Sequence, residues 1–131
     1  MKSQNKFILF LIWTLVILVV VGMPGRYIPK PIGFLTLLSP DKIIHLALFA
    51  PWSFLLLKYF SSVGYQNIFT KNKKLWVVIY GIIYAILTEL LQFYVFIGRN
   101  GNLYDALADI IGVGLGVFIF NRWINRKKQS V

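Results

Sequence analysis

The chain has 131 residues, of which 58% are hydrophobic and 17% aromatic, and it carries a formal net charge of +10. Such an apolar composition indicates an integral membrane protein, and the absence of cysteine excludes disulfides, thiolate nucleophiles and cysteine-ligated metal sites. Lysine and arginine gather in short flanks between apolar runs, not along one face of a soluble fold, which argues against nucleic-acid binding.

Four apolar stretches are long enough to cross a bilayer, which takes about 20 residues of helix. The first covers residues 7–23 and offers no small-residue cleavage site, so we expect an uncleaved span and not a signal peptide. The others cover about 43–60, 75–97 and 104–124. Residues 24–40 hold four of the five prolines and are expected to form an irregular loop or re-entrant turn. The sequence therefore predicts one all-α domain over residues 1–131, an integral membrane four-helix bundle.

The basic residues indicate how the bundle is oriented. In a four-span arrangement, the side that holds both termini carries ten of the 14 lysines and arginines, namely Lys2, Lys6, Lys58, Lys71, Lys73, Lys74, Arg122, Arg126, Lys127 and Lys128. The opposite side carries Arg26, Lys30, Lys42 and Arg99. Because cytoplasmic loops carry the excess of basic residues, we expect a cell-membrane protein with both termini in the cytoplasm.

All four carboxylates and the single histidine lie beside or inside the apolar stretches, as Asp41, His45, Glu89, Asp105 and Asp109. A charge at mid-bilayer depth costs about 2.5–3.5 kcal/mol, so residues of this kind are candidates for function. In the expected topology, all of them fall in the extracytoplasmic half of the bundle. They predict a polar site that opens outward.

Helical spacing groups these residues in pairs. Partners three or four residues apart share one helix face, and the pairs are Asp41 with His45, Glu89 with Gln92, and Asp105 with Asp109. At a rise of about 1.5 Å per residue, His45, Asp109 and Gln92 lie at similar depths below the ends of their helices, and Glu89 lies about one turn deeper. Ala108, Gly112 and Gly116 repeat every fourth residue on the stripe of the two aspartates, so this face is expected to pack closely against another helix.

The residue types suggest roles in a catalytic site. We expect His45 with Asp41 to transfer protons and Glu89 to act as acid or base, with Asp105 and Asp109 beside them. Residues expected to bind substrate are Lys42, Gln92 and Arg99, the last through an anionic group. Structural alternatives stay open: helix capping for Asp41 and Asp105, an interhelical hydrogen bond for Gln92, and an interfacial anchor for Arg99.

A divalent cation is a further possibility, because one histidine with carboxylates can hold a hard, oxygen-liganded ion. The lack of a second histidine or of any cysteine argues against structural zinc. The sequence alone assigns no metal and no cofactor.

Three motifs in order resemble the VanZ-like family of small bacterial membrane proteins: Asp41-Lys42-x-x-His45, then Glu89-x-x-Gln92 with Arg99 seven residues on, then Asp105-x3-Asp109-x2-Gly112. The resemblance covers about residues 41–116 and departs at Asp109, where the family more often has asparagine. It implies a single VanZ-like domain in the bacterial cell envelope. The name-giving member is associated with reduced susceptibility to the glycopeptide teicoplanin, so the implied partners are membrane lipids, envelope precursors or the antibiotic.

Three classes of function follow from these observations. In the first, the polar site modifies lipid-linked or glycan-containing envelope molecules. In the second, the same residues form a non-catalytic network that stabilises the bundle or binds a lipid, an antibiotic or a partner protein. The third is a small proton-coupled transporter, against which four short helices and few polar residues in the cytoplasmic half argue.

Overall fold

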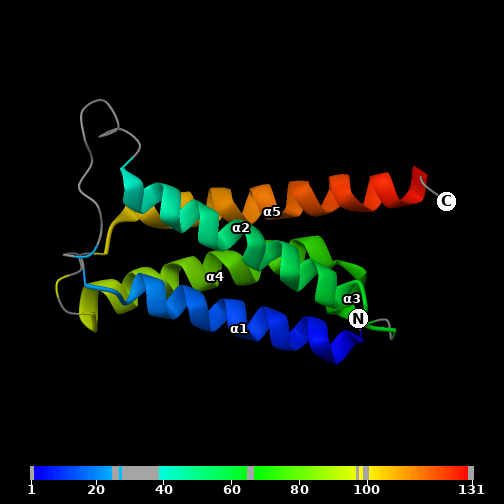
Figure 1. Ribbon diagram of the computed structural model, residues 1–131, viewed down its shortest axis with the longest axis horizontal. Helices are drawn as coiled ribbons and strands as arrows, with labels where there is room; N and C mark the ends of the chain where they lie inside the picture. Colours follow the sequence, from blue (N-terminus) through cyan, green and yellow to red (C-terminus); the bar gives the residue numbers. More distant parts are fainter. Residues whose placement is uncertain are drawn as a thin grey trace.

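The computed structural model describes residues 2–24, 27, 39–64, 67–96, 98 and 101–129. Its helices are α1 (Ser3–Val21), α2 (Pro40–Phe60), α3 (Ile68–Lys71), α4 (Lys73–Tyr94) and α5 (Leu103–Gln129), and the described residues contain no strand. The four long helices lie side by side and alternate in direction, so that both ends of the chain lie at one end of the bundle (Figure 1). The predicted all-α four-helix bundle is confirmed.

The outer surface of the bundle is apolar. Each of the four long helices is long and apolar enough to cross a membrane. Large hydrophobic side chains point outward from all of them, such as Val19 on α1, Ile43 on α2, Leu75 on α4 and Ile111 on α5. Because burying such side chains in lipid removes them from water, this surface fits a bilayer. The chain is a multi-pass membrane protein.

The helices differ from the predicted spans at their ends. Helix α2 begins at Pro40, since proline suits the first helical position and Asp41 favours the positive end of the helix dipole. Helix α5 continues to Gln129 because its last residues are good helix formers whose positive charges favour the C-terminal end. Helix α3 lies inside a predicted connection, where Asn67 and Thr70 form a capping box. The loop expected at 24–40 lies mostly outside the described residues.

Glycines let α5 approach α2 closely. A Cβ on Gly112 would lie 2.8 Å from the Leu46 carbonyl oxygen, and one on Gly116 would overlap Ser53 Oγ and the Ala50 carbonyl oxygen. Ser53 Oγ also donates a hydrogen bond across the interface to a carbonyl of α5, at 3.0 Å. The predicted stripe of small residues is therefore confirmed as a packing face. It places the acidic start of α5 against the first two turns of α2.

Helix α2 packs against the other three long helices. Towards α1, Trp13 Nε1 donates to the Leu48 carbonyl oxygen at 2.8 Å and Trp52 Nε1 donates to Thr14 Oγ1 at 3.0 Å. Helix α4 joins this network because the Tyr84 hydroxyl donates to the Thr14 carbonyl oxygen at 2.8 Å. Hydrogen bonds of this kind fix how the helices are rotated, and hence which side chains meet at the site.

Candidate functional site

Five ionisable side chains from three helices meet where α2 and α5 begin and α4 ends, and His45 lies at their centre. His45 is 1% exposed. Its Nδ1 lies 3.0 Å from Asp109 Oδ1 and 3.9 Å from Glu89 Oε1, whereas its Nε2 faces Asp41 Oδ1 at 4.0 Å. The two ring nitrogens therefore face different carboxylates. We call Asp41, His45, Glu89, Asp105 and Asp109 the acid–histidine cluster.

Asp105 completes this cluster and groups with Asp41 and His45. Potential ligand atoms of Asp41, His45 and Asp105 lie within 4.8 Å of one another, as do those of His45, Glu89 and Asp109. Lys42 Nζ lies 3.7 Å from Asp105 Oδ1 and donates a hydrogen bond to a serine hydroxyl at the start of α2. All five residues predicted to be catalytic, and Lys42 with them, thus lie together.

Asn102 positions the start of α5, a role that we did not predict. Its backbone N–H donates to Glu89 Oε2 at 2.7 Å, and its side-chain Oδ1 accepts from the Tyr104 N–H at 3.0 Å. The neighbouring position 101 suits glycine, because glycine has no Cβ and a Cβ there would lie only 2.7 Å from the Glu89 carbonyl oxygen. One oxygen of Glu89 therefore holds the α4–α5 connection, while the other faces His45. The sequence signal that could have indicated this role is an asparagine directly before the helix, since asparagine is a preferred N-cap residue.

Capping does not account for Asp105. Asn102 supplies the side-chain cap of α5, and Asp105 Oδ1 has no hydrogen-bond partner in the described part of the chain, although Asp105 is only 3% exposed. Asp41 lies in the first turn of α2 with its side chain 28% exposed, so it is the member that opens towards the surface.

Of the other residues predicted to bind substrate, Gln92 does not join the cluster. Gln92 is fully buried and its Nε2 donates to the Val21 carbonyl oxygen at 3.1 Å, so it joins α4 to the end of α1. Three residues along a helix turn a side chain by about 60° from Glu89, which explains why Gln92 faces α1. Arg99 lies outside the described residues. Substrate binding by either residue stays a prediction.

The model of one protein family, VanZ/LLP1, matches residues 6–125. The chain belongs to the VanZ/LLP1 family. The resemblance seen in the three ordered motifs is thereby confirmed. No curated protein and no solved structure matches the chain.

The cluster of this VanZ/LLP1 protein has more acceptors than donors. Buried side-chain oxygens without a hydrogen-bond partner in the described part of the chain are Glu89 Oε1, Gln92 Oε1, Asp105 Oδ1 and Asp109 Oδ2. Leaving one buried acceptor unpaired costs about 1–3 kcal/mol, and more if it is charged. Three of the four belong to the cluster, so it can accept hydrogen bonds from a ligand or hold a cation.

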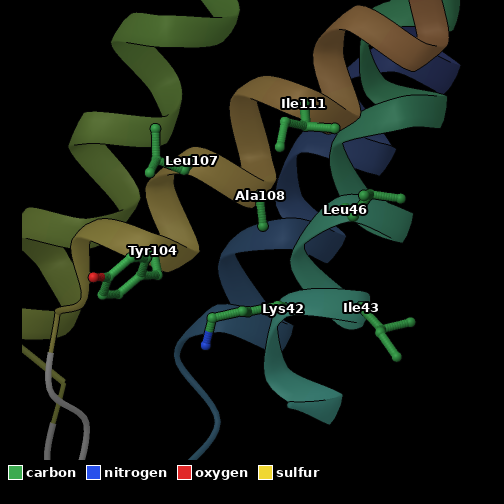
Figure 2. A pocket seen from close by; sticks show the side chains of 7 residues that line it. All are labelled: Lys42, Ile43, Leu46, Tyr104, Leu107, Ala108 and Ile111. Carbon is green, nitrogen blue, oxygen red and sulfur yellow. The ribbon is translucent and has the colours of Figure 1, made fainter. Parts of the chain in front are cut away.

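An apolar groove of about 650 Å³ runs beside the cluster between α2 and α5. Figure 2 shows Lys42 and Tyr104 near the beginning of these helices and Ile111 farther along α5. Lys42 Nζ lies 6.0 Å from the centre of the Tyr104 ring. The charged end of the groove thus adjoins the cluster through the Lys42–Asp105 pair, while the rest of the groove is hydrocarbon.

Proposed function

We propose that this VanZ/LLP1 protein binds and modifies a lipid-linked molecule of the bacterial cell envelope, and that this activity contributes to tolerance of teicoplanin-type glycopeptides. The observation that carries the proposal is the contact between the acid–histidine cluster and the apolar groove at Lys42. A lipid has the same two-part chemistry, with an apolar chain attached to a polar headgroup. An acyl chain in the groove would bring its headgroup to the cluster.

The cluster can support chemistry on that headgroup. Because a carboxylate can only accept, Asp109 holds the proton on His45 Nδ1 and leaves Nε2 to meet a ligand as an electron-pair donor. Glu89 Oε1 has no hydrogen-bond partner in the described residues and can serve as the acid or base. Lys42 supplies a positive charge for a phosphate of the lipid.

Ile111→Trp fills the apolar groove with a larger side chain, so we expect teicoplanin tolerance to fall to the level of a strain without the gene. Leu115→Trp is the matched control, because Leu115 lies one turn further along α5, is also exposed, and does not line the groove. Tolerance is measured in a host that expresses each variant at equal membrane level. Equal tolerance of the two variants would overturn the lipid proposal.

The proposed function requires the acid–histidine cluster to face the outside of the cell, because envelope precursors and glycopeptides meet the protein from outside. Both termini lie at the end of the bundle opposite the beginnings of α2 and α5 (Figure 1), and the first turns of these helices hold Asp41 and Asp105 of the cluster. The ten basic residues on that side favour the cytoplasm. Reporter domains fused to the N-terminus and to the C-terminus should therefore both be active in the cytoplasm. A terminus found outside would place the cluster on the wrong side for this function.

A further inference from the structure

We propose that His45 Nε2, Asp41 and Asp105 bind a divalent cation, with Asp109 as the outer partner that orients the imidazole. The cation site deepens the proposed function and rests on it for the ligand that would reach the cation. Four features of the cluster support it: the charge of its buried part, the direction of the imidazole, a buried oxygen without a hydrogen bond and the spacing of the ligand atoms.

The buried part of the cluster carries more negative than positive charge. Lys42 is the one lysine in ion-pair contact with Glu89, Asp105 and Asp109 among the described residues. With these three carboxylates ionised, the formal charge of the set with Lys42 is −2, or −1 if His45 is also protonated. Uncompensated charge is costly in a buried site, and more so in a membrane protein, where lipid cannot solvate it. A divalent cation would remove most of this imbalance.

The imidazole is held in the orientation that metal sites use. Asp109 is fully buried and accepts from His45 Nδ1 at 3.0 Å, so the neutral ring directs the lone pair of Nε2 towards Asp41. A lone pair that faces a carboxylate at 4.0 Å is repelled unless a proton or a cation lies between them. Histidine ligands usually donate their other N–H to a carboxylate, which fixes the ring and strengthens the metal bond.

Asp105 supplies the third ligand. Its side chain is buried, and its Oδ1 has an ion pair with Lys42 at 3.7 Å but no hydrogen bond in the described part of the chain. Ligand atoms of Asp41, His45 and Asp105 lie within 4.8 Å of one another. Ligands at about 2.0–2.2 Å from a metal lie about 3–3.5 Å apart, so rotations of the two aspartate side chains would close the site. Partly exposed Asp41 gives the ion a path in.

The donor set selects the type of ion. One imidazole nitrogen with two carboxylate oxygens suits Mn²⁺ or Zn²⁺ better than an ion that prefers oxygen alone. Three protein ligands leave positions for water or for a phosphate oxygen. A phosphate-bearing lipid in the groove would therefore meet the cation with its headgroup.

A cation on the opposite side of the ring is less favourable. His45, Glu89 and Asp109 also lie close enough together. However, Nδ1 already donates to Asp109, and Glu89 Oε2 already accepts from the Asn102 N–H. A cation there would have to break a buried hydrogen bond, whereas a cation at Nε2 keeps both contacts.

Mn²⁺ binding to the purified full-length protein in detergent tests the cation site, with free Mn²⁺ followed by electron paramagnetic resonance. We expect one Mn²⁺ per chain with micromolar affinity. Asp41→Asn and Asp105→Asn should each lose this binding, and Asp109→Asn should weaken it about tenfold, as expected for an outer partner. Glu89→Gln removes the same charge from the same cluster and should keep the affinity, so it is the matched control.

Thermal unfolding of each variant shows whether a loss of binding is due to a loss of fold. If Asp105→Asn does not fold, Asp41→Asn still tests the site, because Asp41 is partly exposed. Wild-type binding weaker than millimolar would overturn the cation site. So would loss of binding in Glu89→Gln together with retention in Asp105→Asn, which would move the ion to the other side of the ring. Ile111→Trp should bind Mn²⁺ normally, so a failure of the lipid proposal stays separate from a failure of the cation site.

Discussion

Gly116→Ala adds one methyl group and is expected to destabilise the protein by about 3 kcal/mol, the largest effect on folding that we predict. The added Cβ would overlap both Ser53 Oγ and the Ala50 carbonyl oxygen. The carbonyl belongs to the α2 backbone, so relief requires α2 and α5 to separate along much of their interface. The gain of about 1 kcal/mol in helix propensity on replacing glycine does not offset this cost.

Gly114→Ala is the control for this prediction. Gly114 lies on the same helix, and a Cβ there would meet nothing within 4 Å. The stability of the Gly114→Ala variant should stay unchanged or rise by up to about 1 kcal/mol, because alanine favours helix more than glycine does. Unfolding of both variants in the same detergent provides the comparison. If the two unfold at the same temperature, α2 and α5 are not packed as closely as described.

Asp109→Leu should abolish teicoplanin tolerance, whereas Asp109→Asn should keep most of it. The asparagine oxygen can still accept from His45 Nδ1, so the ring stays oriented. Leucine has a similar size but leaves a buried N–H without an acceptor, which costs about 1–3 kcal/mol, and it lets the ring turn. Both variants lose the same charge, so the contrast isolates the hydrogen bond.

Susceptibility to teicoplanin is measured in strains that express the two Asp109 variants, with membrane levels compared by immunoblot. Equal tolerance in both strains would mean that the orientation of His45 does not matter for function. Loss in both would mean that the carboxylate charge of Asp109 matters more than its hydrogen bond.

The helices and the meeting of the polar pairs could be predicted from the sequence because both follow from periodicity. Long apolar runs fix the four spans, and spacings of three and four residues put Asp109, Gly112 and Gly116 on one face of α5. The glycine stripe then predicts which face approaches another helix. Together they predict that the acids of α5 lie in the interior of the bundle, as found.

Details that depend on helix rotation or on irregular backbone could not be predicted. The ring nitrogen that faces each carboxylate depends on how α2 is rotated against α5, which the interhelical hydrogen bonds fix. Asn102 contacts Glu89 across a turn with no periodic pattern. Gln92 shares a helix with Glu89 but faces α1, because their three-residue spacing differs from a full turn.

The central claim is that the acid–histidine cluster is a functional site and not only a network that stabilises the bundle. The most direct test is His45→Gln, with its unfolding temperature in detergent and its teicoplanin tolerance measured together. Glutamine can still donate to Asp109 from a side chain of similar length, so the fold should be retained. We predict an unfolding temperature close to that of the wild type and complete loss of tolerance. A folded variant with full tolerance, or a loss of tolerance that merely follows a loss of stability, would contradict the claim.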